Sequence, residues 1–278
     1  MPEGDTVWRA AHRLDEALSG RVLTASDFRV PQLATSDLAG RAVLSTVPRG
    51  KHLLTRVAPG PGGEEPLTVH THLKMEGVWH VYAEGERWRR PGHLLRVRLT
   101  VGEQPSRVEA LGFELGTVDL LPTAEEDSVV GHLGPDLLGP DWDAAEAVRR
   151  LTDGGERRAR GVGEALLDQR CLAGIGNVYK SELCFVSGIH PETTVDEVGE
   201  ERLGRMVALA RRMLESNKAR GERTTTGNTR RGQRLWVYGR GRQPCRRCGT
   251  PVLRDLHGPE PQERSTYWCP RCQPAAGR

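Results

Sequence analysis

The chain has few aromatic residues and no long apolar segment. Phe, Tyr and Trp together supply 5% of its 278 residues, and no apolar run approaches the roughly 18–20 residues of a membrane helix. Charged residues recur from the N-terminus onward, so the apolar core of a secretory signal peptide is missing. Internal repeats and low-complexity tracts are missing as well. These absences predict a globular protein of the cytoplasm rather than a membrane, secreted or repeat protein.

Lysine is also scarce, since 36 of the 40 basic residues are arginine. The formal net charge of +3 is unevenly distributed: residues 1–143 hold 15 basic and 21 acidic side chains (−6), and residues 144–278 hold 25 and 16 (+9). Ten basic residues fall within 218–247, against Glu222 alone. Such a segment is typical of a surface that binds a polyanion such as nucleic acid. A solvated basic face, or a coding bias towards arginine, fits the same pattern.

The hydrophobic pattern changes along the chain. Residues 5–19 repeat apolar side chains at helical spacing, with Asp5 or Thr6 as a cap and Gly20 as a stop. Between about 21 and 121 the spacing indicates a two-sheet sandwich, with strands predicted at 21–30, 41–47, 51–57, 67–73, 77–82 and 93–101. Helices are predicted near 143–152, 161–172, 178–187 and 196–216.

The predicted fold class is therefore α+β with two domains. The N-terminal β-sandwich and its helix occupy residues 1–121. An acidic, Pro- and Gly-punctuated linker follows at 122–142, then a helical domain at 143–234 and a cysteine-bearing finger at 235–278.

Four of the six cysteines form two C-x2-C pairs separated by 20 residues: Cys245, Cys248, Cys269 and Cys272. Two thiolate pairs, each on a tight turn, can supply the four ligands of a tetrahedral zinc ion. Four thiolates leave no open position for water, so we expect one structural Zn²⁺ per chain. Two disulfides are the alternative, which an intracellular chain disfavours. The segments between the pairs predict a β-hairpin.

Glycines interrupt the helical pattern at Ala173-Gly174-Ile175-Gly176-Asn177. Residues 163–172 before this turn and 178–188 after it both read as helices, with Asn177 at the N-cap of the second. Exposed N–H groups at a helix N-terminus bind anions such as phosphate. An ordinary helix hairpin with a glycine turn fits the same residues.

Pro2 and Glu3 directly precede the first helix. Removal of Met1 would make Pro2 a terminal secondary amine, whose pKa of about 7.7–8 lies well below that of lysine and is lowered further by the helix N-terminus. Such an amine adds to a sugar aldehyde to form an iminium, which favours elimination of a β-phosphate. Glu3 can protonate the ring oxygen of a deoxyribose. A chance Met-Pro start, with a glutamate suited to a helix N-terminus, is the alternative.

Five motifs occur in one order: MPEGDTVWRAA at the start, RGKHLL at 49–54, HLKMEG at 72–77, LLDQRCLAGIGNVYKSEL at 166–183, and VYGR at 237–240 followed by the paired cysteines. Together they resemble, essentially end to end, the formamidopyrimidine-DNA glycosylase and endonuclease VIII family of bifunctional DNA repair enzymes. The resemblance implies a β-sandwich and a helix–two-turn–helix domain with a zinc finger, which flank a DNA-binding cleft.

The resemblance also implies roles for single residues. Pro2 corresponds to the Schiff-base nucleophile, Glu3 to the general acid and base, and Lys51, in a β-hairpin, to a phosphate and proton-transfer partner. Asn177 resembles the phosphate-binding turn residue of the family, and Arg264 the arginine at the tip of the zinc hairpin that grips phosphate at the lesion. A solvated lysine, a helix cap and a surface arginine are the ordinary alternatives for the last three.

The motifs of two branches are combined in this chain. Gly4-Asp5 resembles the endonuclease VIII branch, but Thr6 stands where the family usually has a glutamate, which Asp5 could replace. HLKMEG resembles the other branch, whose methionine wedges into the gap left by a flipped base; that residue is Met75, with a buried strand-end methionine as the alternative. The loop predicted at 107–116 lacks the Arg-Arg-Phe of that branch. We therefore expect an endonuclease VIII-like enzyme that removes oxidised pyrimidines and cleaves the abasic site by β,δ-elimination.

Other functions fit parts of the pattern. A formamidopyrimidine-type glycosylase for oxidised purines is one alternative, and a non-catalytic zinc-ribbon DNA-binding protein or a zinc-ribbon RNA-binding or translation factor are others. The last two have no need of Pro2 and Glu3. The expected partner is damaged double-stranded DNA, with single-stranded or bubble DNA as an alternative. The chain is expected to be a monomer that associates with the nucleoid through DNA and has no membrane contact.

Overall fold

The computed structural model describes residues 2–258, 261 and 263–275. The chain divides into two compact units, residues 1–132 and 133–278, and each has an apolar core of its own. The boundary between the units falls inside the segment 122–142 that was predicted as a linker. Among the described residues, no helix is long and apolar enough to cross a membrane.

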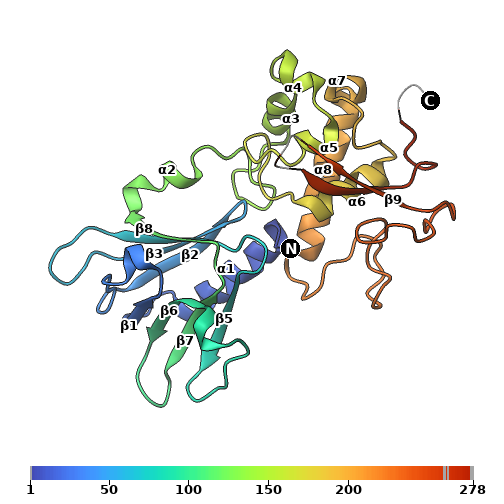
Figure 1. Ribbon diagram of the computed structural model, residues 1–278. Coiled ribbons are helices and arrows are strands. Elements are labelled where there is room, and N and C mark those ends of the chain that lie inside the picture. The colour runs from blue at the N-terminus through green and yellow to red at the C-terminus, as the bar shows by residue number, and fades with distance from the viewer. Residues whose placement is uncertain (1, 259–260, 262, 276–278) are drawn as a thin grey trace. The chain divides into compact units, whose positions relative to one another are not determined.

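The first unit is a sandwich of two four-stranded antiparallel sheets, as predicted (Figure 1). The first sheet has the order β1-β6-β7-β5, with β1 at Leu23–Phe28, β5 at Val78–Ala83, β6 at Leu95–Val101 and β7 at Val108–Phe113. The second has the order β2-β3-β4-β8, with β2 at Val43–Arg49, β3 at His52–Val57, β4 at Leu67–His72 and β8 at Thr117–Pro122. Short 3-10 turns lie at Pro31–Leu33 and Gly92–Leu94.

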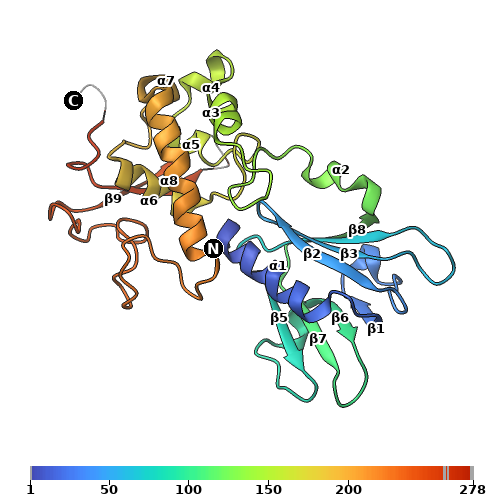
Figure 2. The same ribbon diagram turned by 180° about the vertical axis from the view of Figure 1, so that it is seen from behind.

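A single long helix, α1 at Gly4–Leu18, packs against strands of both sheets (Figure 2). Val7, Ala11, Leu14 and Leu18 recur at helical spacing and are each at most 1% exposed. The carboxylate of Asp15 accepts a hydrogen bond of 2.7 Å from the backbone N–H of Thr46 on β2. This helix therefore ties the N-terminus of the chain to the sandwich.

The start of α1 differs from the predicted cap at Asp5 or Thr6. Glu3 is the N-cap residue, and the helix has already begun at Gly4. The carboxylate of Asp5 instead accepts a hydrogen bond from the backbone N–H of Thr6, 2.8 Å away. Asp5 is 1% exposed, and thus lies inside the first turn rather than before it.

The predicted loop at 107–116 is wrong, because most of it is the strand β7, which pairs with β6 on one side and β5 on the other. Ala110, Leu111 and Phe113 are fully buried. A strand buried on both faces lacks the alternation of polar and apolar residues that marks an exposed one. Gly112 leaves room for the neighbouring side chains, since a Cβ there would overlap Leu115.

The outer face of the second sheet is covered by residues 123–132, here called the strap. The strap contains η3 at Thr123–Glu125 and α2 at Asp127–Val130. Between them, Glu126 accepts two hydrogen bonds from Arg56, of 2.8 and 2.6 Å, and one of 2.7 Å from the hydroxyl of Thr68. These contacts fasten the last segment of the first unit to β3 and β4.

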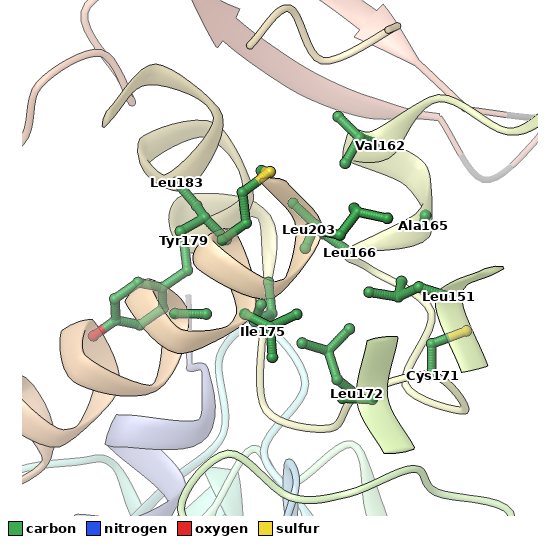
Figure 3. Packing of buried hydrophobic residues seen from close by; sticks show 14 of the residues in the cluster. Leu151, Val162, Ala165, Leu166, Cys171, Leu172, Ile175, Tyr179, Leu183 and Leu203 are labelled. Carbon is green, nitrogen blue, oxygen red and sulfur yellow. The ribbon is translucent and has the colours of Figure 1, made fainter. Parts of the chain in front are cut away.

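The second unit is helical, with α3 at Ala144–Thr152, α4 at Gly155–Ala159, α5 at Val162–Ala165, α6 at Asn177–Ser187, α7 at Val195–Val198 and α8 at Glu200–Lys218. Leu151, Leu166, Tyr179 and Leu203 come from different segments and meet in one core (Figure 3). Asp143 caps α3 by accepting hydrogen bonds from Ala145 and Glu146.

Two predicted helices of this unit are shorter than expected. The helix predicted at 161–172 ends at Ala165. The carboxylate of Asp168 accepts hydrogen bonds from the backbone N–H of Arg170 (3.1 Å) and the guanidinium of Arg160 (3.0 Å), which turns the chain. The helix predicted at 196–216 is divided at Gly199, whose φ of 74° no helical residue adopts.

The cysteine-bearing segment belongs to the second unit. Its β-hairpin is formed by β9 at Leu253–His257 and β10 at Arg264–Trp268, which pair antiparallel as predicted. Phe185 on α6 packs into a small core with Val237, Val252 and two of the cysteines. Strand β10 also contacts α6, so the finger rests on the helix that follows the glycine turn.

Candidate active site and metal centre

Pro2 and Glu3 stand at the N-terminal end of α1. The Glu3 side chain and backbone have no exposure to solvent, and its carbonyl oxygen accepts hydrogen bonds from the N–H groups of Thr6 (2.8 Å) and Val7 (3.0 Å). Pro2 is half-buried and lies at the positive end of the helix dipole. Met1, whose removal the Pro2 chemistry requires, lies outside the described residues.

Lys51 occupies the turn between β2 and β3. Arg49 and His52 form the last pair of these strands, so the turn consists of Gly50 and Lys51 alone. Gly50 has a positive φ of 58°, whereas the φ of Lys51 is not positive. This is the pattern of a type II′ turn with glycine first. Lys51 is half-buried, and its positive charge helps to lower the pKa of His72 on β4.

Met75 lies in the turn between β4 and β5 and is 57% exposed. That exposure excludes the alternative of a buried strand-end methionine. Gly77 closes the turn by donating a 2.9 Å hydrogen bond to the carbonyl of Leu73. A Cβ at this glycine would overlap the same carbonyl oxygen, so the close approach requires glycine.

Asn177 is joined to the finger strand that carries Arg264. Asn177 is the first residue of α6 and Gly176 is its N-cap, one position earlier than predicted. The Asn177 amide donates a 2.7 Å hydrogen bond to the carbonyl of Ser265, the residue after the exposed Arg264. Its Oδ1 atom is buried and has no hydrogen-bond partner among the described residues. The expected phosphate-binding residue is therefore also the link between the helix turn and the hairpin.

Two buried charged residues on α6 were not predicted from the sequence as part of the site. The ammonium of Lys180 donates a 2.6 Å hydrogen bond to Thr266 on β10. Glu182 accepts hydrogen bonds from the backbone N–H groups of residues 236–238 at 2.7–2.8 Å and from the Thr225 hydroxyl. Burial raises the pKa of this carboxyl group, and its four donors oppose the shift. The signal that could have found them was the presence of two charged residues in α6, a helix that is buried from Asn177 to Phe185.

The four paired cysteines form one cluster, with all four Sγ atoms within 4.8 Å of one another. The Sγ atoms of Cys248 and Cys269 are 3.4 Å apart, and those of Cys245 and Cys272 are 4.0 Å apart. A disulfide requires about 2.05 Å, whereas a tetrahedral zinc ion with sulfurs at about 2.3 Å places them roughly 3.8 Å apart. The donor set and its spacing thus fit a closed zinc site. Hydrogen bonds from Thr250 lower the pKa of Cys248 to about 6, whereas burial raises the pKa of Cys269 and raises that of Cys272 to about 12.

The predicted site residues are divided between the two units. Pro2, Glu3, Lys51 and Met75 belong to the first unit, and Asn177, Arg264 and the cysteines belong to the second. Within the second unit, Asn177 is hydrogen-bonded to the hairpin strand that carries Arg264.

Comparisons with known proteins cover both units. Residues 1–112 match the formamidopyrimidine-DNA glycosylase N-terminal domain, and residues 133–229 match the formamidopyrimidine-DNA glycosylase H2TH domain. A probable endonuclease 8 2 of Streptomyces coelicolor is 56% identical over 98% of this chain and 94% of its own. The DNA-(apurinic or apyrimidinic site) lyase Nei2 of Mycolicibacterium smegmatis is 45% identical over 99% of this chain and 100% of its own.

The chain belongs to the formamidopyrimidine-DNA glycosylase and endonuclease VIII family. Its more similar relatives carry the names endonuclease 8 and Nei2, which confirms the predicted branch. The predicted enzyme class, a DNA glycosylase with AP lyase activity in base excision repair, is confirmed at that level.

A solved structure supports the fold. The Lactococcus lactis formamidopyrimidine-DNA glycosylase, bound non-covalently to DNA containing an AP site, has a TM-score of 0.77 to this chain at 20% identity. The match covers 99% of this chain and 100% of that one. The predicted α+β class with two domains is confirmed.

Proposed function

We propose that this DNA glycosylase and AP lyase acts on damaged double-stranded DNA through an amine of Pro2, and that oxidised pyrimidines are its preferred lesions. The observation that carries the proposal is the position of Pro2 at the positive end of α1, directly before the fully buried Glu3. The structures with similar folds hold DNA with an abasic site, an oxidised pyrimidine, Fapy-dG or carbocyclic 8-oxo-G. Their DNA supports damaged DNA as the substrate class.

The proposed reaction begins when the Pro2 nitrogen attacks C1′ of the lesion nucleotide. The glycosidic bond breaks, and the base leaves with its bonding electrons and the proton that the amine gives up. Glu3 protonates the ring oxygen as the sugar opens, which leaves an iminium between Pro2 and C1′. A secondary amine gives an iminium without an N–H to lose, so this cation acts as an electron sink. The 3′ phosphate leaves by β-elimination and the 5′ phosphate by δ-elimination, and water then releases the sugar fragment and restores the amine.

Contacts to the DNA backbone come from three further residues in this proposal. Lys51, at the tip of its two-residue turn, binds a phosphate and transfers protons. Asn177 and Arg264, joined through Ser265, bind phosphate at the lesion. An Asn177 phosphate contact would come in addition to the hydrogen bond that its amide already donates. Met75 is exposed and can enter the gap left by an extruded base.

Zinc holds the finger in this proposal and takes no part in the chemistry. Cys245, Cys248, Cys269 and Cys272 fill all four positions of a tetrahedral ion, one per chain, and leave none for water. The enzyme would act as a monomer on duplex DNA in the cytoplasm, at the nucleoid. Single-stranded or bubble DNA is the alternative substrate.

The test separates the two roles at the N-terminus. Glu3→Gln retains the amine but loses the proton donor, a group typically worth about 10²–10⁴-fold in rate. Base excision from an oxidised-pyrimidine duplex should fall by that factor, while cleavage of a ready-made abasic site, whose aldehyde is already partly open, should persist. His12→Gln on the exposed face of α1 is the control and should leave both rates unchanged. Equal losses on the two substrates would refute the role assigned to Glu3.

A further inference from the structure

Three histidines and an aspartate gather on the outer face of the second sheet, under the strap. In the strand register, His52 on β3 lies opposite His72 on β4, and His70 on β4 lies opposite Asp119 on β8. His132, at the end of the strap, places its ring edge against His52 with ring centroids 6.3 Å apart. The proposed reaction uses none of these five side chains.

The cluster is not a metal site. Among the described residues, the four cysteines form the one group of His, Cys, Asp and Glu side chains close enough to share an ion. Both ring nitrogens of His70 are already engaged, because Nδ1 lies 2.9 Å from Asp119 and Nε2 lies 2.8 Å from Nδ1 of His52. The ring planes of His52 and His70 are nearly parallel, with an angle of 18° between them and ring centroids 5.0 Å apart.

The hydrogen-bonded chain decides which nitrogen of each ring carries hydrogen. The carboxylate of Asp119 can only accept, so Nδ1 of His70 donates to it. When His70 is neutral, its Nε2 atom accepts from the Nδ1–H of His52. The remaining nitrogen of His52, Nε2, therefore keeps a lone pair and can take up a proton without breaking a hydrogen bond of the chain.

His72 is arranged in the opposite way. Its Nδ1 accepts a 2.9 Å hydrogen bond from the backbone N–H of Lys74, a residue in the left-handed region with a φ of 52°. Neutral His72 therefore carries its hydrogen on Nε2. Protonation at Nδ1 would break the bond to Lys74 and loosen the turn that precedes Met75. Of these two histidines, His52 is thus the one that can take up a proton without losing a hydrogen bond.

Burial and positive neighbours keep both rings neutral in the free protein. Burial is the largest cause that lowers the pKa of His52, to about 3, and the surrounding histidines and Lys74 add to it. Burial, Lys74 and Lys51 lower the pKa of His72 to about 4. The groups that face His52 are His70 and His72 from β4, Asp119 from β8 through His70, His132 from the strap, and Lys74 from the turn after β4. Lys51, the residue before His52, acts on His72. Asp119 is the single carboxylate of this set.

We infer that this cluster couples DNA binding to proton uptake: a phosphate held at the Lys51 turn draws a proton from solvent onto Nε2 of His52. The negative charge of the phosphate offsets the repulsion from the lysines and histidines. The His70–Asp119 pair then stabilises the new imidazolium through the hydrogen bond at Nδ1. Because binding and protonation are linked, DNA affinity must rise as the pH falls. The inference rests on the phosphate role proposed for Lys51.

Calorimetry measures the coupling directly. The whole zinc-bound protein is titrated with a duplex that contains a tetrahydrofuran abasic analogue, in two buffers of different protonation enthalpy and equal ionic strength. The difference in heat gives the number of protons taken up. We expect uptake to increase towards one proton per bound duplex as the pH falls from 7 to 5.5, and the Kd to fall by up to about tenfold per pH unit where uptake is complete.

Two variants and a control locate the proton. His52→Gln retains a polar side chain but removes the acceptor, and should lower the uptake by the part that His52 contributes. Asp119→Asn removes the charge that stabilises the imidazolium, and should move the uptake to lower pH even if His52→Gln fails to fold. His12→Gln removes a histidine from the same unit, 55% exposed and outside the cluster, and should leave the uptake unchanged.

Lys51→Gln separates a failure of this inference from a failure of the proposed function. Wild-type affinity in Lys51→Gln would overturn the phosphate role of Lys51, and the coupling with it. Weakened binding in Lys51→Gln, together with the same proton uptake in wild type, His52→Gln and Asp119→Asn, would overturn the coupling alone.

Discussion

Glu182 shows how one buried carboxylate can organise a distant segment. Three consecutive backbone N–H groups, those of residues 236–238, and the hydroxyl of Thr225 converge on its two oxygens. No solvent reaches this side chain, so the four donors replace its hydration shell. The contact joins α6 to the polypeptide that leads into the finger.

Glu182→Gln should therefore cost about 1–3 kcal/mol, because an amide NH₂ would face one or more of the same donors and leave them unpaired. Equilibrium unfolding measures the loss, and hydrogen exchange should show faster exchange at residues 236–238. Glu201→Gln on α8 is the control, since that side chain is 87% exposed and should change stability by less than about 0.5 kcal/mol. Unchanged exchange at 236–238 in Glu182→Gln would show that the carboxylate does not hold this segment.

The lowered pKa of His52 also affects the stability of the protein in acid. The pKa of His52 is lowered to about 3 in the folded protein, against about 6.5 in an unfolded chain. As the pH falls below about 6.5, His52 takes up a proton in the unfolded chain, whereas in the folded protein it does so only near pH 3. The free energy of unfolding is therefore highest above pH 6.5 and falls as the pH approaches 3.

The free energy of unfolding should consequently fall by about 1–2 kcal/mol through His52 between pH 7 and pH 5. Thermal unfolding of wild type and His52→Gln across this range tests the sign, and the variant should lose less stability in acid than wild type. A steeper loss in the variant would contradict the neutral state of the ring.

At the scale of elements, most strands of the sandwich are predicted from the sequence. The segments 51–57 and 67–73 form β3 and β4 with nearly the predicted bounds. The segment 107–116 differs from its prediction as a loop, because most of it forms the strand β7. Asp168 shortened a predicted helix through hydrogen bonds to Arg160 and Arg170, which local patterns do not reveal.

Within the candidate site, too, some residues are predicted from the sequence and others are not. Residues within short motifs were found, including the cysteine pairs, whose spacing alone predicts a cluster. Asn177 was placed one position too early in the helix. Lys180, Glu182 and the Asp119–His70–His52 chain were not found, because their partners lie far away in the sequence and only the fold brings them together.

The finger is the element whose folding should depend on metal. Its core is small, formed by a few side chains around the cysteines, and such a core does not fold without a metal ion. Cys248→Ser should lose zinc, loosen the hairpin and abolish DNA binding, while the sandwich keeps its melting transition. Metal analysis, circular dichroism and DNA binding measure these three effects.

Cys171→Ala is the matched control, because Cys171 lies in the helical core, outside the cluster. This variant should retain one zinc ion per chain. Normal activity in a zinc-free Cys248→Ser protein would contradict the structural role of the metal.

For the whole molecule, the division of charge agrees with the division into two units. The basic excess lies in the C-terminal half, which carries the finger and the exposed Arg264. Binding to DNA should therefore depend strongly on salt, since each neutralised phosphate releases counterions.

Arg264→Ala should weaken binding to a damaged duplex and reduce the slope of log K against log salt by about one. Arg205→Ala on α8, where the arginine pairs with Glu201, is the control and should leave the slope unchanged. A slope equal to that of wild type in Arg264→Ala would exclude a phosphate contact at this residue.

The central claim is that the Pro2 amine forms the covalent intermediate. Borohydride reduces such an iminium to a stable bond, so the purified enzyme is reacted with abasic DNA in its presence, digested, and analysed by mass spectrometry. The DNA adduct should be found on an N-terminal peptide that starts at Pro2, and a variant extended at its N-terminus should form no adduct. An adduct in the extended variant through a lysine such as Lys51 would contradict the role of the Pro2 amine.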